Sequence, residues 1–173
     1  MNARTVSVTA VGIAIVALFV TLIRIPVPAT GGFWHLGVLA ETFVAVAFGP
    51  VIGAVAAGIG AAMADTLGGF ATFAPLTLIA HGSTGLIAGW LGWRRGWSGM
   101  LLGWVLGGLT QVALYFVGEA TVYGFGMAGA AAELPGNLVQ VGLGVFGLVL
   151  FLQVRKAYPQ IEQLATGPSF EEQ

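Results

Sequence analysis

Polar and ionisable side chains interrupt the apolar stretches of this chain at a small number of positions. They are Glu41, His81, Gln111, Tyr115, Glu119, Asn137 and Gln140. Ionisable groups are costly in hydrocarbon, and those found there usually face a cavity, a pathway or a partner. Carboxylates, amides, an imidazole and a phenol can donate and accept hydrogen bonds around a small polar molecule. Their chemistry favours a binding site inside a membrane protein.

Several of these residues recur at the spacing of a single helix face. Residues three or four apart in a helix are neighbours on its surface. Three polar stripes follow this rule: Thr77, His81 and Thr84; Gln111, Tyr115 and Glu119; and Glu133, Asn137 and Gln140. Single polar residues also join neighbouring membrane helices by hydrogen bonds. Three stripes together favour a shared site over that alternative.

The composition is that of a membrane protein. Of the 173 residues, 57% are hydrophobic and 8% are charged, and the net charge is −1, so no basic patch for nucleic acid is present. The chain has no cysteine, which excludes disulfides and thiolate chemistry. Small-residue spacings such as Gly49 to Gly53 and Gly85 to Gly89 permit close helix packing.

The apolar stretches predict an all-α membrane protein, a bundle of six transmembrane helices. We expect helices at residues 5–24, 36–48, 51–64, 75–93, 97–118 and 132–154. The second and third are short, about 20 Å long against a hydrocarbon core of about 30 Å. Residues 1–156 would form the membrane substrate-binding domain, and residues 157–173 a polar cytoplasmic tail.

Basic residues predict the orientation. Arg4, Arg94, Arg95, Arg155 and Lys156, five of the six basic residues, fall on one side of such a bundle, and only Arg24 falls on the other. Because cytoplasmic loops carry the excess of Lys and Arg, both termini should lie in the cytoplasm. The polar stripes then occupy the outer half of the bilayer and the inner half is apolar. This favours a cup open to the outside over a pore.

Four short segments carry a family resemblance. They are residues 10–14 (AVGIA), 48–54 (FGPVIGA), 75–82 (PLTLIAHG) and 134–140 (LPGNLVQ). With the length and the six spans, they make the chain similar to the substrate-binding S components of energy-coupling factor (ECF) transporters, the vitamin importers of prokaryotes. The resemblance covers nearly the whole chain.

The resemblance implies a site near the outer surface, with the first outer loop, residues 25–35, as its lid. It implies a membrane T component and two ABC-type ATPases as partners, in a prokaryotic cytoplasmic membrane. Ala10 and Ala14 match the small-residue face that docks on the T component. The chain has no Walker motif, so ATP use would belong to the partners.

The same resemblance argues against a metal cargo. The metal-binding branch of the family starts with Met-His, whereas this chain starts with Met1 and Asn2. No pair of His, Asp or Glu residues has the spacing of a metal site on one helix. We therefore expect neither a metal nor a cofactor.

The candidate ligand is a nitrogen heterocycle. Acidic residues near the outer side, Glu41, Asp65, Glu119 and Glu133, outnumber Arg24. This disfavours a dianion and favours a neutral or cationic ring with donor groups, such as an aminopyrimidine, because a carboxylate accepts a charge-assisted hydrogen bond.

Individual roles follow from residue type. We expect Asn137 and Gln140 to supply neutral hydrogen bonds, Glu119 a charged one and Trp34 a stacking face. Gly144, one turn beyond Gln140, should serve packing instead.

Two other functions stay open at this point. A stand-alone secondary transporter is less favoured because the chain shows no inverted repeat. An intramembrane hydrolase would use Ser83 and His81, but residues two apart on a helix face different directions, and no Gly-x-Ser-x-Gly elbow is present.

Overall fold

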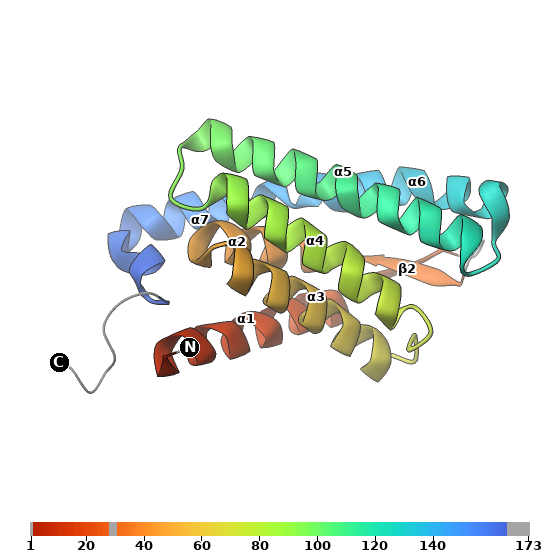
Figure 1. Ribbon diagram of the computed structural model, residues 1–173, viewed down its shortest axis with the longest axis horizontal. Coiled ribbons are helices and arrows are strands. Elements are labelled where there is room, and N and C mark those ends of the chain that lie inside the picture. The colour runs from red at the N-terminus through yellow and green to blue at the C-terminus, as the bar shows by residue number, and fades with distance from the viewer. Residues whose placement is uncertain (1, 28–30, 166–173) are drawn as a thin grey trace.

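Long helices run side by side along the molecule, and a small hairpin lies at one end (Figure 1). The computed structural model describes residues 2–27 and 31–165. Its helices are α1 (Ala3–Leu22), α2 (Gly37–Phe48), α3 (Pro50–Leu67), α4 (Ala74–Gly92), α5 (Trp97–Thr121), α6 (Gly126–Leu143) and α7 (Val145–Ala157). The expected all-α bundle is confirmed, with α6 and α7 in the place of the sixth helix.

The sixth helix differs from the expected range 132–154. It begins earlier, at Gly126, and it is interrupted at Gly144. A Cβ atom on Gly144 would lie 2.7 Å from Nε1 of Trp104 and 2.9 Å from Oγ1 of Thr42. The Trp104 indole donates to the Val141 carbonyl at this break, at 2.9 Å. Gly144 therefore serves close packing, as expected.

Two helices lie deep in the bundle. Helix α2 has 12 residues, most of them buried, and α4 packs against α2, α3 and α5. Among the described residues, four helical stretches are long and apolar enough to cross a membrane: α1, α3, α5 and the combined stretch Gly126–Ala157. Helix α2 is too short, and α4 carries a buried polar face that lowers its apolarity.

Helices α3 and α4 pack backbone against backbone. A Cβ atom on Gly53 would lie 2.7 Å from the Gly85 carbonyl oxygen, and one on Gly89 would lie 2.7 Å from the Cα of Pro50. Glycine at these positions allows an approach that any side chain would block. Helix α3 also extends past its expected end at residue 64, so Asp65 lies on its last turn beside α4.

The expected first outer loop is an antiparallel hairpin. Strand β1 (Arg24–Val27) pairs with β2 (Gly32–His35), with Arg24 opposite His35 and Ile25 opposite Trp34. Residues 28–30, at its tip, lie outside the described part of the chain.

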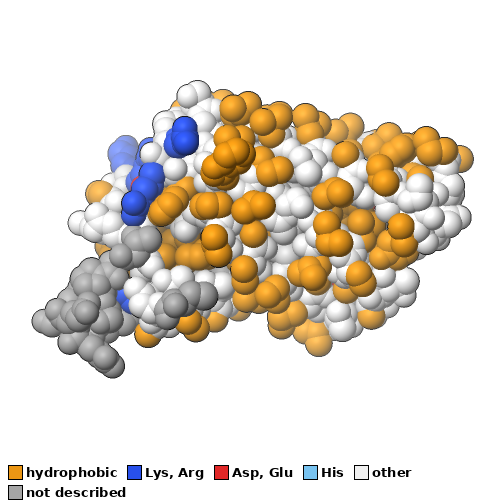
Figure 2. Space-filling model, viewed as in Figure 1, with side chains coloured by type: hydrophobic (Ala, Val, Ile, Leu, Met, Phe, Trp, Pro, Cys, Tyr) orange, Lys and Arg blue, Asp and Glu red, His pale blue; other side chains and the backbone are white. Residues whose placement is uncertain are grey.

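The two ends of the bundle differ in charge. The start of α1, the end of α7 and the turn between α4 and α5 lie at one end, while the hairpin and the α3–α4 and α5–α6 connections lie at the other (Figure 1). Lys and Arg side chains gather at the first end, and hydrophobic side chains cover the flanks between the ends (Figure 2). This arrangement places the start of α1 and the end of α7 on one side, as the basic residues predict.

The start of the polar tail packs on the bundle. Residues Pro159–Gln163 form a 3₁₀ helix in which Ile161 is buried. Arg155 lies 3.5 Å from Glu162, and the Thr5 hydroxyl donates to the Ala165 carbonyl at 2.8 Å. The remainder of the predicted tail, residues 166–173, lies outside the described residues.

Single-cysteine labelling tests which end faces outward. Since the chain has no cysteine, Arg95→Cys and Val122→Cys each introduce one thiol at an exposed position at opposite ends of α5. We expect a membrane-impermeant maleimide added to intact cells to label position 122 and not position 95, because the basic end stays in the cytoplasm. Labelling of position 95 alone would show the reverse orientation.

Candidate functional site

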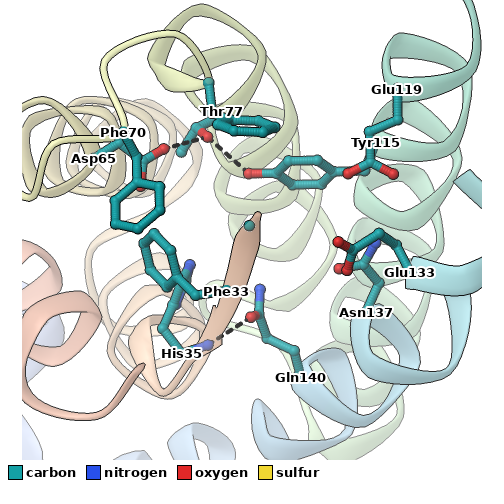
Figure 3. A pocket seen from close by; sticks show the side chains of 12 residues that line it. Phe33, His35, Asp65, Phe70, Thr77, Tyr115, Glu119, Glu133, Asn137 and Gln140 are labelled. Atoms are coloured by element: carbon teal, nitrogen blue, oxygen red, sulfur yellow. Dashed lines mark hydrogen bonds between the residues drawn. The ribbon is translucent and has the colours of Figure 1, made fainter. Parts of the chain in front are cut away.

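A cavity lies at the hairpin end of the bundle, between the hairpin and helices α3 to α6 (Figure 3). Its empty volume, including the open mouth, is about 440 Å³, and the centre of a water molecule can move through about 40 Å³ of it. The lining residues are Gly32, Phe33, His35, Asp65, Phe70, Phe73, Thr77, Tyr115, Glu119, Glu133, Asn137 and Gln140. The cavity is narrow, and its lining combines polar side chains with three phenylalanine rings.

The structure separates the predicted site residues into two groups. Tyr115 and Glu119 on α5 and Asn137 and Gln140 on α6 line the cavity. The others do not: Glu41, His81 and Gln111 are wholly buried in the bundle, and Trp34 lies on β2 against α6. Helix geometry explains the first group, because the stripes on α5 and α6 turn their outer residues toward the same space.

The hairpin is held against α6 at two points. The Trp34 indole donates to Oε2 of Glu133 at 3.1 Å, and the His35 backbone N–H donates to Oε1 of Gln140 at 2.8 Å. Gly136 makes room for this contact, since a Cβ atom there would overlap the Trp34 ring. Trp34 is not among the residues that line the cavity, whose rings are those of Phe33, His35, Phe70, Phe73 and Tyr115, so the stacking role of Trp34 stays a prediction.

Arg24 ties the base of the hairpin to α3. Its guanidinium donates to the Ala64 carbonyl at 2.9 Å and lies over the ring of Phe33, 4.7 Å from the centroid. A cation at the end of a helix interacts favourably with the last carbonyls and the helix dipole. The Arg24 charge thus stabilises the end of α3, and none of the described residues that line the cavity is Lys or Arg.

One wall of the cavity is a chain of hydrogen bonds across three helices. The Thr77 hydroxyl on α4 donates to Oδ2 of Asp65 on α3 at 2.6 Å. The Thr77 oxygen lies 2.8 Å from the Tyr115 hydroxyl on α5. Figure 3 shows both bonds on the side of the cavity opposite Gln140.

Polar pairs close the bundle beneath the cavity. Nδ1 of His81 lies 2.8 Å from the Glu41 carboxylate, and both side chains are fully buried. Thr84 donates to Oε1 of Gln111 at 3.0 Å. These contacts join α2 to α4 and α4 to α5, so they support a structural role for Glu41, His81 and Gln111.

His35 links this layer to the cavity. Its Nδ1 accepts the Gly37 backbone N–H at 3.0 Å, and its ring centroid lies 5.2 Å from that of His81. Burial lowers the pKa of the His35 imidazole well below its usual value, and the nearby His81 and Arg24 lower that pKa further. His35 is therefore neutral at pH 7, with its proton on Nε2.

Sequence reasoning did not select several lining residues as site residues. Thr77 and Glu133 belong to the polar stripes, and their spacing from His81 and Asn137 is the signal that points to them. Asp65 was expected in a loop and Gly32 and His35 in the lid. Their approach to the cavity depends on the length of α3 and on the hairpin pairing, which the sequence alone does not reveal.

Taken together, a bundle of membrane helices with a polar cavity at one end defines a membrane component that binds a small solute. The family model for the S component of ECF-type riboflavin transporters matches residues 1–158. The chain belongs to this family. Because the family consists of transporter components, the hydrolase alternative is excluded.

Two individual proteins are similar to the chain in sequence. An uncharacterised protein of Pyrococcus woesei is 39% identical over 125 residues, covering 72% of this chain and 82% of that protein. The thiamine precursor transporter HmpT of Lactococcus lactis subsp. cremoris is 29% identical over 147 residues, covering 83% of this chain and 82% of that protein.

A solved structure shares the fold. It is described as the S component of a bacterial ECF transporter and superposes with a TM-score of 0.71. The match covers 89% of this chain and 96% of that chain at 15% sequence identity. At this identity the similarity shows the fold alone.

The Glu41–His81 pair yields a stability prediction. We expect Glu41→Leu and His81→Phe each to lower stability by about 3–5 kcal/mol, because each leaves a buried polar partner unpaired. The double variant, which removes both polar groups, should lose less than the sum of the two single losses. Thermal unfolding in detergent micelles measures these changes. Strictly additive losses would show that the two side chains do not depend on each other.

Proposed function

We propose that this chain is the S component of an ECF-type importer that captures a small nitrogen heterocycle with amino donor groups. The observation that carries the proposal is the set of carboxylates in the cavity. Asp65, Glu119 and Glu133 all line it, each with only 4% of its surface exposed, and no Lys or Arg accompanies them in the lining. Such a site prefers a cation or a donor-rich ring, because charge-assisted hydrogen bonds are stronger than neutral ones.

Aromatic side chains support a flat ligand. Phe33 and Phe70 lie on the hairpin side of the cavity with ring centroids 4.6 Å apart, and Phe73 lines it as well. An aromatic heterocycle can stack against such rings.

The size of the cavity favours a small ring. The 40 Å³ open to the centre of a water molecule corresponds to about three to four such molecules. A single pyrimidine ring needs a smaller rearrangement of the hairpin and side chains than a three-ring flavin does. The similarity to a thiamine precursor transporter points in the same direction, whereas the name of the family model points to riboflavin.

The proposed cycle follows from the family. The cavity opens toward the outside of a prokaryotic cytoplasmic membrane, and the hairpin, acting as a lid, covers the bound ring. A membrane T component and two ABC-type ATPases then drive its release to the inside. The second candidate is a secondary transporter that works without these partners, and uptake by cells that express this chain alone would favour it.

Binding measurements test the substrate class. We expect 4-amino-2-methylpyrimidine to bind the purified protein more tightly than riboflavin in calorimetric titration. Asn137→Ala should weaken pyrimidine binding roughly five- to a hundredfold, since losing one hydrogen-bond partner costs about 1–3 kcal/mol. Glu119→Gln should weaken it as well, because a charged acceptor becomes a neutral amide.

Leu138→Ala is the matched control, since Leu138 is the next residue on α6 and is half exposed on the outer surface. Its affinity should equal that of the parent. Tight riboflavin binding with no pyrimidine binding would replace the proposed substrate while leaving the transport function intact.

Coupling to the partners gives a separate prediction. Ala10 and Ala14 are both exposed on α1, opposite the buried Gly12, which packs on α2 and α3. We expect Ala14→Trp to abolish uptake in cells that express the whole transporter while pyrimidine binding by the isolated protein stays normal, because a large ring blocks close helix contact.

Leu109→Trp is the control for this surface, because Leu109 is also exposed but lies on α5. It should leave uptake unchanged. If Ala14→Trp also transports normally, α1 is not the docking face.

A further inference from the structure

Thr77 stands at the centre of a three-residue wall of the cavity, between Asp65 and Tyr115 (Figure 3). We propose that Thr77 is a positioning residue that fixes the direction of the hydrogen bonds in this wall. Thr77 acts through Tyr115, which it leaves as a hydrogen-bond acceptor. The site then prefers a ring that presents a donor to Tyr115 over a ring of the same shape that presents an acceptor. The inference rests on the proposed function, because it specifies how the cavity recognises its heterocycle.

The direction of the bonds follows from counting protons. A hydroxyl group has one proton, and an ionised carboxylate has none. The Thr77 proton lies in the 2.6 Å bond to Asp65, so the 2.8 Å bond between Thr77 and Tyr115 must use the proton of Tyr115. Tyr115 then has only lone pairs left for a ligand.

The wall therefore offers acceptors. They are the hydroxyl oxygen of Tyr115 and the second oxygen of Asp65, Oδ1. Glu119, one turn beyond Tyr115 on α5, adds another, because its Oε2 has no hydrogen-bond partner within residues 2–27 and 31–165. A ligand acceptor placed against this wall would meet lone pairs.

The opposite side of the cavity has the reverse polarity. Oε1 of Gln140 accepts the His35 backbone N–H at 2.8 Å, which fixes the orientation of this amide. Its NH₂ group is turned toward the cavity (Figure 3). A ring bound between the two sides needs a donor toward Tyr115 and an acceptor toward Gln140.

An amino-to-oxo exchange replaces the donor that faces Tyr115 by an acceptor without changing the shape of the ring. A 4-aminopyrimidine presents an NH₂ donor beside a ring-nitrogen acceptor. The corresponding pyrimidin-4-one presents a carbonyl acceptor beside a ring N–H donor. We expect the parent protein to prefer the amino ring by roughly 10- to 100-fold, since a mismatched partner leaves buried polar groups unsatisfied.

Titration of 4-amino-2-methylpyrimidine and 2-methylpyrimidin-4-one against Thr77 variants tests the proposal. Thr77→Val keeps the shape but removes the hydroxyl, so Tyr115 regains a proton that it can donate to a carbonyl. The preference for the amino ring should fall to about threefold or less, because the variant loses the discrimination that roughly one hydrogen bond provides. Thr77→Ser keeps the hydroxyl and should retain the parent preference. A purely structural role of Thr77 would weaken both ligands equally.

Tyr115→Phe provides a second variant that leaves the Asp65–Thr77 bond intact. It removes the acceptor itself, so the amino preference should fall here too. Adding Thr77→Val to Tyr115→Phe should change the preference no further, because no phenol proton remains to be redirected. The inference is overturned if either Thr77→Val or Tyr115→Phe leaves the preference for the amino ring unchanged. It is also overturned if the double variant changes that preference beyond the effect of Tyr115→Phe.

The outcomes also separate the inference from the proposed function. If the parent binds the amino ring and Thr77→Val keeps its preference, only the role of Thr77 is wrong. If the parent binds neither pyrimidine, the proposed substrate class is wrong and this inference is overturned with it.

Discussion

The need to pair every polar side chain without help from water is the constraint on which this structure depends. In an apolar bundle an unpaired polar group costs free energy that no solvent returns. Beneath the cavity, Glu41 contacts His81, and Thr84 contacts Gln111. These contacts join α2 to α4 and α4 to α5 in the interior. They leave Nε2 of His81 and Nε2 of Gln111 without a hydrogen-bond partner among the described residues, and Oε2 of Glu119 beside the cavity is in the same position.

Close helix packing makes the pairing possible. Glycines at the contact of α3 and α4 let the two backbones approach until side chains near their outer ends meet. Asp65 and Thr77, twelve residues apart in the chain, then lie 2.6 Å apart. A larger residue at Gly53 or Gly89 would separate the helices and with them this wall of the site. The apolar half of the bundle thus positions the polar half.

The hairpin completes the site by a contact of a different kind. It is anchored at its base by Arg24, which donates to the end of α3, and one position further along β2 by Trp34, whose ring fits against Gly136. Each anchor combines hydrogen bonding with the contact of an aromatic ring.

The sequence alone determined the class of structure. Apolar stretches set the helices, basic residues set which ends lie together, and the spacing on α5 and α6 placed Tyr115, Glu119, Asn137 and Gln140 on common faces. These are local properties, because hydropathy and helix periodicity depend only on neighbours along the chain.

Tertiary structure decided which polar residues face the cavity. Glu41 and His81, both predicted as site residues, are fully buried on α2 and α4 and contact each other. Asp65 joined the cavity because α3 continues by one more turn, and His35 joined it through the hairpin. The break at Gly144 came from contacts with Trp104 and Thr42 on other helices. Such outcomes depend on distances between segments far apart in the chain, and no local pattern of residues encodes those distances.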